Sequence, residues 1–159
     1  MRLARTLASA LALPLVLLAA LAPLGTAGGG GSLVGFPSFA SVSLGGQQAL
    51  LLDAGADHAG RAFLILGSAS GTTPGTSIAG LPLALNPDDY FGFTLIAPNE
   101  PYFANSNGTL DGEGRAIATL DVPLGTDPAL AGVTLHHAFV LYDPVCDFVS
   151  NSVPLDLIP

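Results

Sequence analysis

The chain has 159 residues, half of them hydrophobic, and its twelve acidic and four basic residues give a formal net charge of −8 at pH 7. It contains no lysine. Nucleic acids and anionic membranes are therefore excluded as partners, because both require clustered cations. A single cysteine, Cys146, excludes an intramolecular disulfide, so the fold must depend on its hydrophobic core.

The N-terminal segment has the pattern of a secretory signal peptide. Arg2 and Arg5 precede an apolar run from Leu7 to Ala22. This run is shorter than the ~20 residues that a spanning helix needs, and Pro14 interrupts it. Small residues up to Ala27 predict cleavage after that position. We therefore expect a secreted or periplasmic protein with no membrane span after cleavage.

Three segments follow from this division: a signal peptide over 1–27, a flexible glycine-rich linker over 28–35 and a single domain over 36–159. Removal of the signal peptide leaves Arg61 and Arg115 against twelve acidic residues, a net charge of −10. The remaining domain of roughly 120 residues is long enough for one core. Cys146 is either a small buried hydrophobe or a thiol that pairs between molecules.

Short apolar or alternating runs separated by Gly, Pro and Asx turns predict strands along the whole domain. The predicted strands are Ser38–Leu44, Gln47–Asp53, Arg61–Gly67, Leu81–Leu85, Tyr90–Ile96, a pair within Asn107–Pro123, Val133–Tyr142 and Val149–Ile158. The run within 61–67 is apolar on both faces, which predicts a strand that is covered on each side.

The segment Asn107–Pro123 predicts a β-hairpin. Its turn would be Asp111-Gly112-Glu113-Gly114, because glycine supplies the positive φ of tight hairpin loops. After the turn, alternate residues from 116 to 122 are apolar and define a face toward a core, while Ile117 is an apolar exception on the outer face.

About eight or nine short strands at roughly ten-residue spacing are typical of an antiparallel β-sandwich, Ig-like or jelly-roll-like. A β-barrel is the alternative architecture, since spacing alone does not separate the two.

Five segments in order resemble a β-sandwich domain that is common in secreted proteins of GC-rich environmental bacteria, often at the C-terminus of larger exported chains. They are Leu52–Gly55, Phe63–Ser68, Leu85–Asp88, Gly108–Asp111 and Leu135–Ala138, and the closing Asn151–Leu155 is similar to the usual end of that domain. The resemblance implies the fold and export. It implies no activity, because function belongs to sites rather than folds.

Two sets of acidic residues are the candidate metal ligands, since calcium prefers carboxylate oxygens. Asp53 and Asp57 lie near His58 in one predicted loop, and Asp88 and Asp89 follow Asn86-Pro87. No loop places ligands at the alternate positions of a calcium-binding loop. Turn formation and capping explain the same residues without a metal, so we predict no cofactor and keep calcium as the alternative.

The candidate ligand-binding residues are Tyr102 and Phe103, an aromatic pair in a loop rich in Pro and Asn that could stack on a sugar. No catalytic constellation is apparent: His136 and His137 are adjacent on a strand and point to opposite faces, and there is no G-x-S-x-G motif. His137, on the apolar face, is expected to be a core or rim histidine.

These observations predict a secreted, non-catalytic extracellular module for adhesion, surface assembly or protein binding, with an unknown extracellular protein or glycan as its partner. The first alternative is a carbohydrate- or calcium-binding module. The second is a small secreted hydrolase, which would require a pocket that joins a histidine to an acid and a serine.

Overall fold

The structure is a computed structural model that describes residues 32–159. The predicted signal peptide and the first four residues of the predicted linker, 28–31, lie outside the described residues. Residues 33–35, predicted as flexible linker, instead belong to the first strand, Leu33–Phe36, and Leu33 is buried in the core. The elements in chain order are β1 (Leu33–Phe36), β2 (Phe39–Ser41), β3 (Gly46–Asp53), η1 (Ala56–His58), β4 (Ala62–Ser68), β5 (Thr76–Ile78), β6 (Leu81–Leu83), α1 (Asp89–Ile96), β7 (Phe103–Ala104), β8 (Asn107–Thr109), β9 (Arg115–Val122), η2 (Pro128–Leu130), β10 (Thr134–Asp143), β11 (Phe148–Val149) and β12 (Val153–Ile158).

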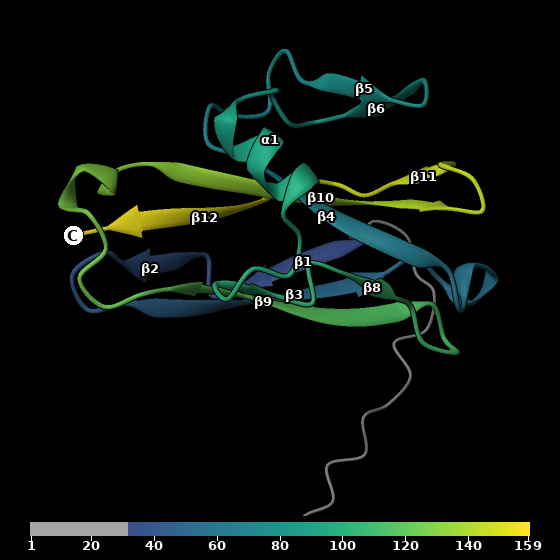
Figure 1. Cartoon of the computed structure of the whole chain (residues 1–159), viewed down its shortest axis with the longest axis horizontal. Helices are drawn as coiled ribbons and strands as arrows, with labels where there is room; N and C mark the ends of the chain where they lie inside the picture. The colour runs from purple at the N-terminus through teal and green to yellow at the C-terminus, as the bar shows by residue number, and fades with distance from the viewer. Residues whose placement is uncertain (1–31) are drawn as a thin grey trace, which may run out of the picture.

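The fold is mostly β, as predicted, with two larger sheets and one small hairpin. One sheet has the order β1-β3-β9-β7, and the other has the order β2-β12-β10-β4-β8 with β11 beside β10. Within residues 32–159 every strand pair is antiparallel except β2 and β12, which are parallel, so the second sheet is mixed. Figure 1 shows the two sheets as layers, with α1 and the β5–β6 hairpin above β4 and β10.

One hydrophobic core lies between the two sheets, because both contribute their apolar faces to it. It includes Leu50 and Leu52 of β3, Ala118 of β9, and Ile65 and Phe139 of β4 and β10. The alternation predicted for 116–122 is confirmed: the inner side chains of β9 are mostly buried and Ile117 is exposed.

A second, smaller core lies on the opposite face of β4 and β10. There Leu64, Leu66, Ala138 and Val140 pack with residues of the β5–β6 segment, and Phe91 of α1 and Cys146 pack against the same cluster. Strand β4 is therefore buried on both faces, which confirms the prediction from its uninterrupted apolar run. Cys146 is a free thiol of intermediate exposure.

The predicted hairpin over Asn107–Pro123 is wrong. Its first strand, β8, pairs with β4, whereas its second strand, β9, pairs with β3 and β7 in the other sheet. The turn itself forms, because the Asp111 carboxylate accepts hydrogen bonds from the backbone N–H groups of Glu113 and Arg115. Local turn chemistry thus reverses the chain, but the two arms pair with strands of different sheets, β4 and β3.

The segment predicted as a strand over Tyr90–Ile96 is instead the helix α1. Asp88 is its N-cap, and its carboxylate accepts a hydrogen bond of 2.8 Å from the Phe91 N–H, which satisfies one of the free donors of the first turn. Phe91, Phe93 and Leu95 alternate in the sequence, which predicts one shared strand face, but the helix separates them. Phe91 packs against the second core, whereas Phe93 and Leu95 are exposed. None of the helices in the described part of the chain is long and apolar enough to cross a membrane.

The structure also has more strands than predicted, twelve over residues 32–159. One additional strand, β1, has four residues and lies mostly in the predicted linker. Strands β5 and β7 are two or three residues long and lie within 68–80 and 97–107, where the Ser, Thr, Gly, Pro and Asn content predicts loops. Such short strands carry no clear periodicity of their own, because two or three residues do not complete a pattern of alternation.

Candidate functional site

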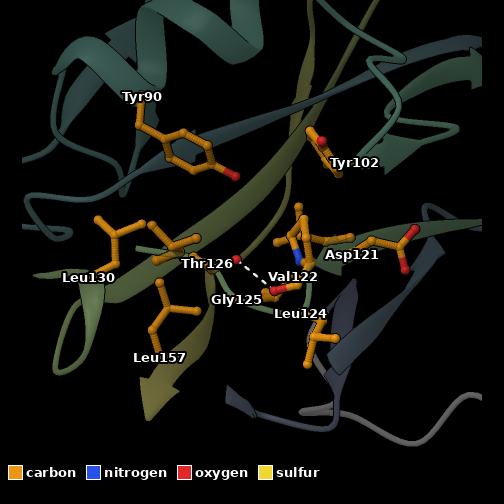
Figure 2. Close-up of a pocket in the computed structure, with 12 residues that line it drawn as sticks. Tyr90, Tyr102, Asp121, Val122, Leu124, Gly125, Thr126, Leu130 and Leu157 are labelled. Atoms are coloured by element: carbon orange, nitrogen blue, oxygen red, sulfur yellow. Dashed lines mark hydrogen bonds between the residues drawn. The ribbon is translucent and has the colours of Figure 1, made fainter. Parts of the chain in front are cut away.

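An apolar pocket of about 330 Å³, largely open to solvent, is lined by residues of both larger sheets. Strands β9, β10 and β12 contribute its walls, and α1 contributes Tyr90. Figure 2 shows Tyr90 and Tyr102 on opposite sides of it, with Leu130 and Leu157 below Tyr90. The lining residues are Tyr90, Tyr102, Leu120, Asp121, Val122, Pro123, Leu124, Gly125, Thr126, Leu130, Leu135 and Leu157. We call this cavity the tyrosine pocket.

The connection from β9 to β10 forms one side of the tyrosine pocket. Pro123 follows β9 and cannot extend the ladder of hydrogen bonds, and its carbonyl accepts a bond of 2.7 Å from the Thr126 hydroxyl, drawn in Figure 2. The chain then forms η2, capped by the carboxylate of Asp127. Leu124 is 76% exposed and Leu130 41% exposed, so the rim of the pocket is itself apolar.

Tyr90 is positioned by the packing of α1 against β4. The Thr94 hydroxyl accepts a hydrogen bond of 2.9 Å from the Gly67 N–H, so α1 satisfies a backbone donor of β4 with a side chain. Gly67 also permits close packing, since a Cβ there would lie 2.9 Å from Cδ1 of Tyr90 and would overlap Cε1. Glycine is thus required where the tyrosine ring lies on the strand.

Tyr90 and His137 form a hydrogen-bonded pair at the pocket. The Tyr90 hydroxyl lies 2.9 Å from Nε2 of His137, and the His137 side chain is fully buried between the rings of Tyr90 and Phe103. Nδ1 of His137 is buried and has no hydrogen-bond partner in the described part of the chain. The prediction that His137 is a core histidine is confirmed.

Burial keeps both members of this pair uncharged at neutral pH. Removal from water, reinforced by the neighbouring His136, lowers the pKa of His137 from 6.5 to about 3. Removal from water, reinforced by the Asp88 carboxylate, raises the pKa of Tyr90 above its ordinary value. The pocket therefore offers a neutral phenol and a neutral imidazole, which are hydrogen-bonding groups rather than charges.

The two predicted ligand-binding aromatic residues have different environments. Tyr102 is 59% exposed and lines the tyrosine pocket, held beside β9 by a hydrogen bond from the Asp121 N–H to the Tyr102 carbonyl. Phe103 is only 5% exposed and belongs to the central core. The prediction of an exposed Tyr102–Phe103 pair is therefore wrong, because β7 turns Phe103 inward when it pairs with β9.

The predicted calcium candidates are not brought together. Asp53 forms an ion pair with Arg115 at 2.9 Å, Asp57 lies in η1, and Asp89 begins α1. Across residues 32–159 no group of three or more His, Cys, Asp or Glu side chains is arranged to hold a metal ion.

Asp88 is a structural cap. One carboxylate oxygen accepts bonds from the Ser68 hydroxyl, the Ala69 N–H, and the N–H and hydroxyl of Ser70, all between 2.7 and 2.9 Å. Burial alone would raise the pKa of Asp88, but the hydrogen bonds outweigh it, with that of the Ser70 side chain foremost, and hold this pKa well below its usual range. Asp88 thereby ties the 68–71 loop to α1.

A second surface is the outer face of the four-stranded sheet. Val34 of β1 lies opposite Leu51 of β3, which lies opposite Ile117 of β9. These side chains are 49%, 45% and 60% exposed, and Phe36, two residues along β1, is 74% exposed. We call these four residues the apolar row. No described element covers them.

Sequence reasoning missed Tyr90 and the 123–130 connection as parts of a site. Tyr90 was expected in a strand, and the connection was expected only to link strands. Comparisons with protein-family models, with characterised proteins and with solved structures give no match for the chain.

Proposed function

We propose that this chain is a secreted, non-catalytic β-sandwich module that binds another protein through the apolar row. The sandwich class is supported by two facing sheets that share one core. Secretion is supported by the basic and apolar pattern of residues 1–27. Protein binding is supported by the observation that carries the proposal: four large apolar side chains exposed together on one sheet face.

The outer face has the layout of a protein interface, an apolar centre with polar ends. At one end Arg115 pairs with Asp53 and with Glu113. At the other end the Gln47 amide donates a hydrogen bond of 2.7 Å to the Asp121 carboxylate. The apolar row lies between these ends because the residues alternate along β3 and β9.

The net charge of the chain favours a different protein over a second copy of the chain as the partner. The net charge of −10 expected after signal removal opposes the stacking of two copies face to face, since like charges repel. The polar ends carry Asp53, Glu113 and Asp121 against Arg115 alone. The partner is therefore a different extracellular protein with an apolar patch bordered by basic residues.

Affinity capture with matched variants tests this proposal. The exported chain is immobilised and exposed, with chemical cross-linking, to culture medium and envelope proteins of the producing cells. Ile117→Lys places a charge in the apolar row, whereas Leu44→Lys places the same charge at a residue that is 80% exposed in the turn between β2 and β3.

We expect the wild type and Leu44→Lys to retain the same partner. Ile117→Lys should retain at least tenfold less of it, because a buried unpaired charge costs more than one hydrogen bond. Equal retention by all three proteins, or capture of no partner by the wild type, would contradict the proposal. Size-exclusion chromatography first confirms that each variant is folded and monomeric.

Export has its own test. N-terminal sequencing of the chain recovered from culture medium or periplasm should show Gly28 as its first residue. Recovery of the chain only inside the cell, with Met1 or Arg2 still present, would contradict the proposal that the chain is secreted.

A further inference from the structure

The tyrosine pocket has the size and lining of a small-molecule site and lies apart from the apolar row. Its volume of about 330 Å³ is at the lower end of the ~300–1,000 Å³ of ligand pockets. Leu120, Leu135 and Leu157 are among its apolar lining residues. An apolar molecule that enters such a pocket removes its own surface and that of the pocket from water, which favours binding.

Polar side chains of the lining are those of Tyr90, Tyr102, Asp121 and Thr126. The Tyr90 hydroxyl points from α1 toward the middle of the pocket (Figure 2). His137 is neutral, so its ring carries one hydrogen, on Nε2 or on Nδ1. A hydrogen on Nδ1 would be a buried donor without a partner, and such donors are rarer than unpartnered acceptors. We therefore assign the hydrogen to Nε2, which donates to the Tyr90 oxygen. The O–H of Tyr90 is then available to donate into the pocket.

The lining also excludes two classes of ligand. A carboxylate is disfavoured because Asp121 is the charged residue of the lining and the chain as a whole is strongly negative. A sugar is disfavoured because its hydroxyl groups would face leucine, valine and proline side chains and lose their hydrogen bonds to water. Tyr102, opposite Tyr90, provides an aromatic wall against which a ring can pack.

We propose that the tyrosine pocket binds a small, uncharged, ring-containing molecule whose single carbonyl oxygen accepts a hydrogen bond from the Tyr90 hydroxyl. The pocket shares Asp121 with one polar end of the protein-binding face but contains no residue of the apolar row, so neither proposal depends on the other.

Three probes of similar shape test the proposal: acetophenone, which has a ring and a carbonyl; cumene, which lacks the oxygen; and benzoate, which is an anion. Each is titrated into the exported chain and followed by the methyl NMR signals of Leu120, Leu135 and Leu157. We expect saturable shifts with acetophenone, about 5- to 10-fold weaker binding of cumene through loss of one hydrogen bond, and no saturable shift with benzoate.

Two variants connect these results to the pocket. Tyr90→Phe keeps the ring and should remove the preference for acetophenone over cumene. Leu135→Trp fills the cavity and should abolish the binding of both neutral probes. Leu44→Lys, outside the pocket, should bind as the wild type does, and far-ultraviolet circular dichroism shows which variants are folded.

Three outcomes would overturn the proposal: no saturable shift with acetophenone up to its solubility limit, benzoate bound as tightly as acetophenone, or an unchanged preference in Tyr90→Phe. Capture of a partner through Ile117 would be unaffected by any of these results, so failure of one proposal is distinguishable from failure of the other.

Discussion

His137 should make this protein less stable in mild acid, well before its carboxylates titrate. In the folded chain the His137 side chain is fully buried, and burial, with a smaller effect of His136, lowers its pKa to about 3. In the unfolded chain the pKa returns to about 6.5. Between these two values the unfolded state binds more protons than the folded state. The free energy of unfolding therefore falls as the pH falls, and the contribution is fully present only above pH 6.5.

The size of this effect follows from the two pKa values. Each pH unit well below 6.5 costs about 1.4 kcal/mol, so the loss between pH 7.5 and pH 5 is about 2 kcal/mol. Such a loss is a large share of the ~5–15 kcal/mol that stabilises a typical domain. The range above pH 5 isolates the histidines, because carboxylates in the unfolded chain titrate near pH 4.

Replacement of the imidazole tests this reasoning. His137→Gln keeps a polar side chain that can bond to the Tyr90 hydroxyl but does not titrate. Urea unfolding at pH 7.5, 6.5, 5.75 and 5.0 gives the free energy of unfolding for the wild type and the variant. The difference between them should change by about 2 kcal/mol in favour of the variant on going to pH 5.

Tyr90→Phe is the matched control for this measurement. It removes the hydrogen bond to Nε2 but leaves the burial of His137, the larger cause of its lowered pKa, in place. Its free energy of unfolding should therefore retain the pH dependence of the wild type. Parallel curves for the wild type and His137→Gln between pH 7.5 and 5 would refute the argument that a buried, neutral His137 controls stability in this range.

The packing and capping of α1 lead to further predictions. Gly67→Ala should destabilise the chain by about 1–3 kcal/mol in urea unfolding, because the new methyl group overlaps the Tyr90 ring. Gly92→Ala, in α1 and with open space around it, should instead stabilise the chain by about 0.5–1 kcal/mol. A change of the same sign in both variants would contradict the packing of α1 on β4. Asp88→Asn should cost about 1–3 kcal/mol, since an amide donor would face the N–H and hydroxyl donors of Ser70. Because the pKa of Asp88 is lowered in the folded state, its stabilisation should be present above about pH 4 in the wild type and lost below it. Thermal unfolding below about pH 4 measures this contribution. If the unfolding temperature of Asp88→Asn falls as steeply with pH as that of the wild type, the Asp88 carboxylate does not provide this stabilisation.

The faces of the regular strands follow directly from the order of residues. The alternation along β9 and β12 correctly indicates which side chains are buried, and the uninterrupted apolar run of β4 correctly indicates burial on both faces. These features can be predicted from the sequence because the two-residue period of a strand is a local property of the backbone. The turn at Asp111 is local in the same sense, since its hydrogen bonds connect residues up to four positions apart.

Strand partners, the helix and the pocket depend on contacts between residues far apart in the chain. The same turn at Asp111 is compatible with a hairpin or with a crossing between sheets, and the crossing is decided by the distant strands β4 and β3, with which β8 and β9 pair. Tyr90 and His137 are separated by 47 positions and meet only when α1 packs on β4. The pocket and the uncharged state of His137 therefore depend on tertiary structure alone. Burial and desolvation arise from the packed assembly of elements rather than from any one segment.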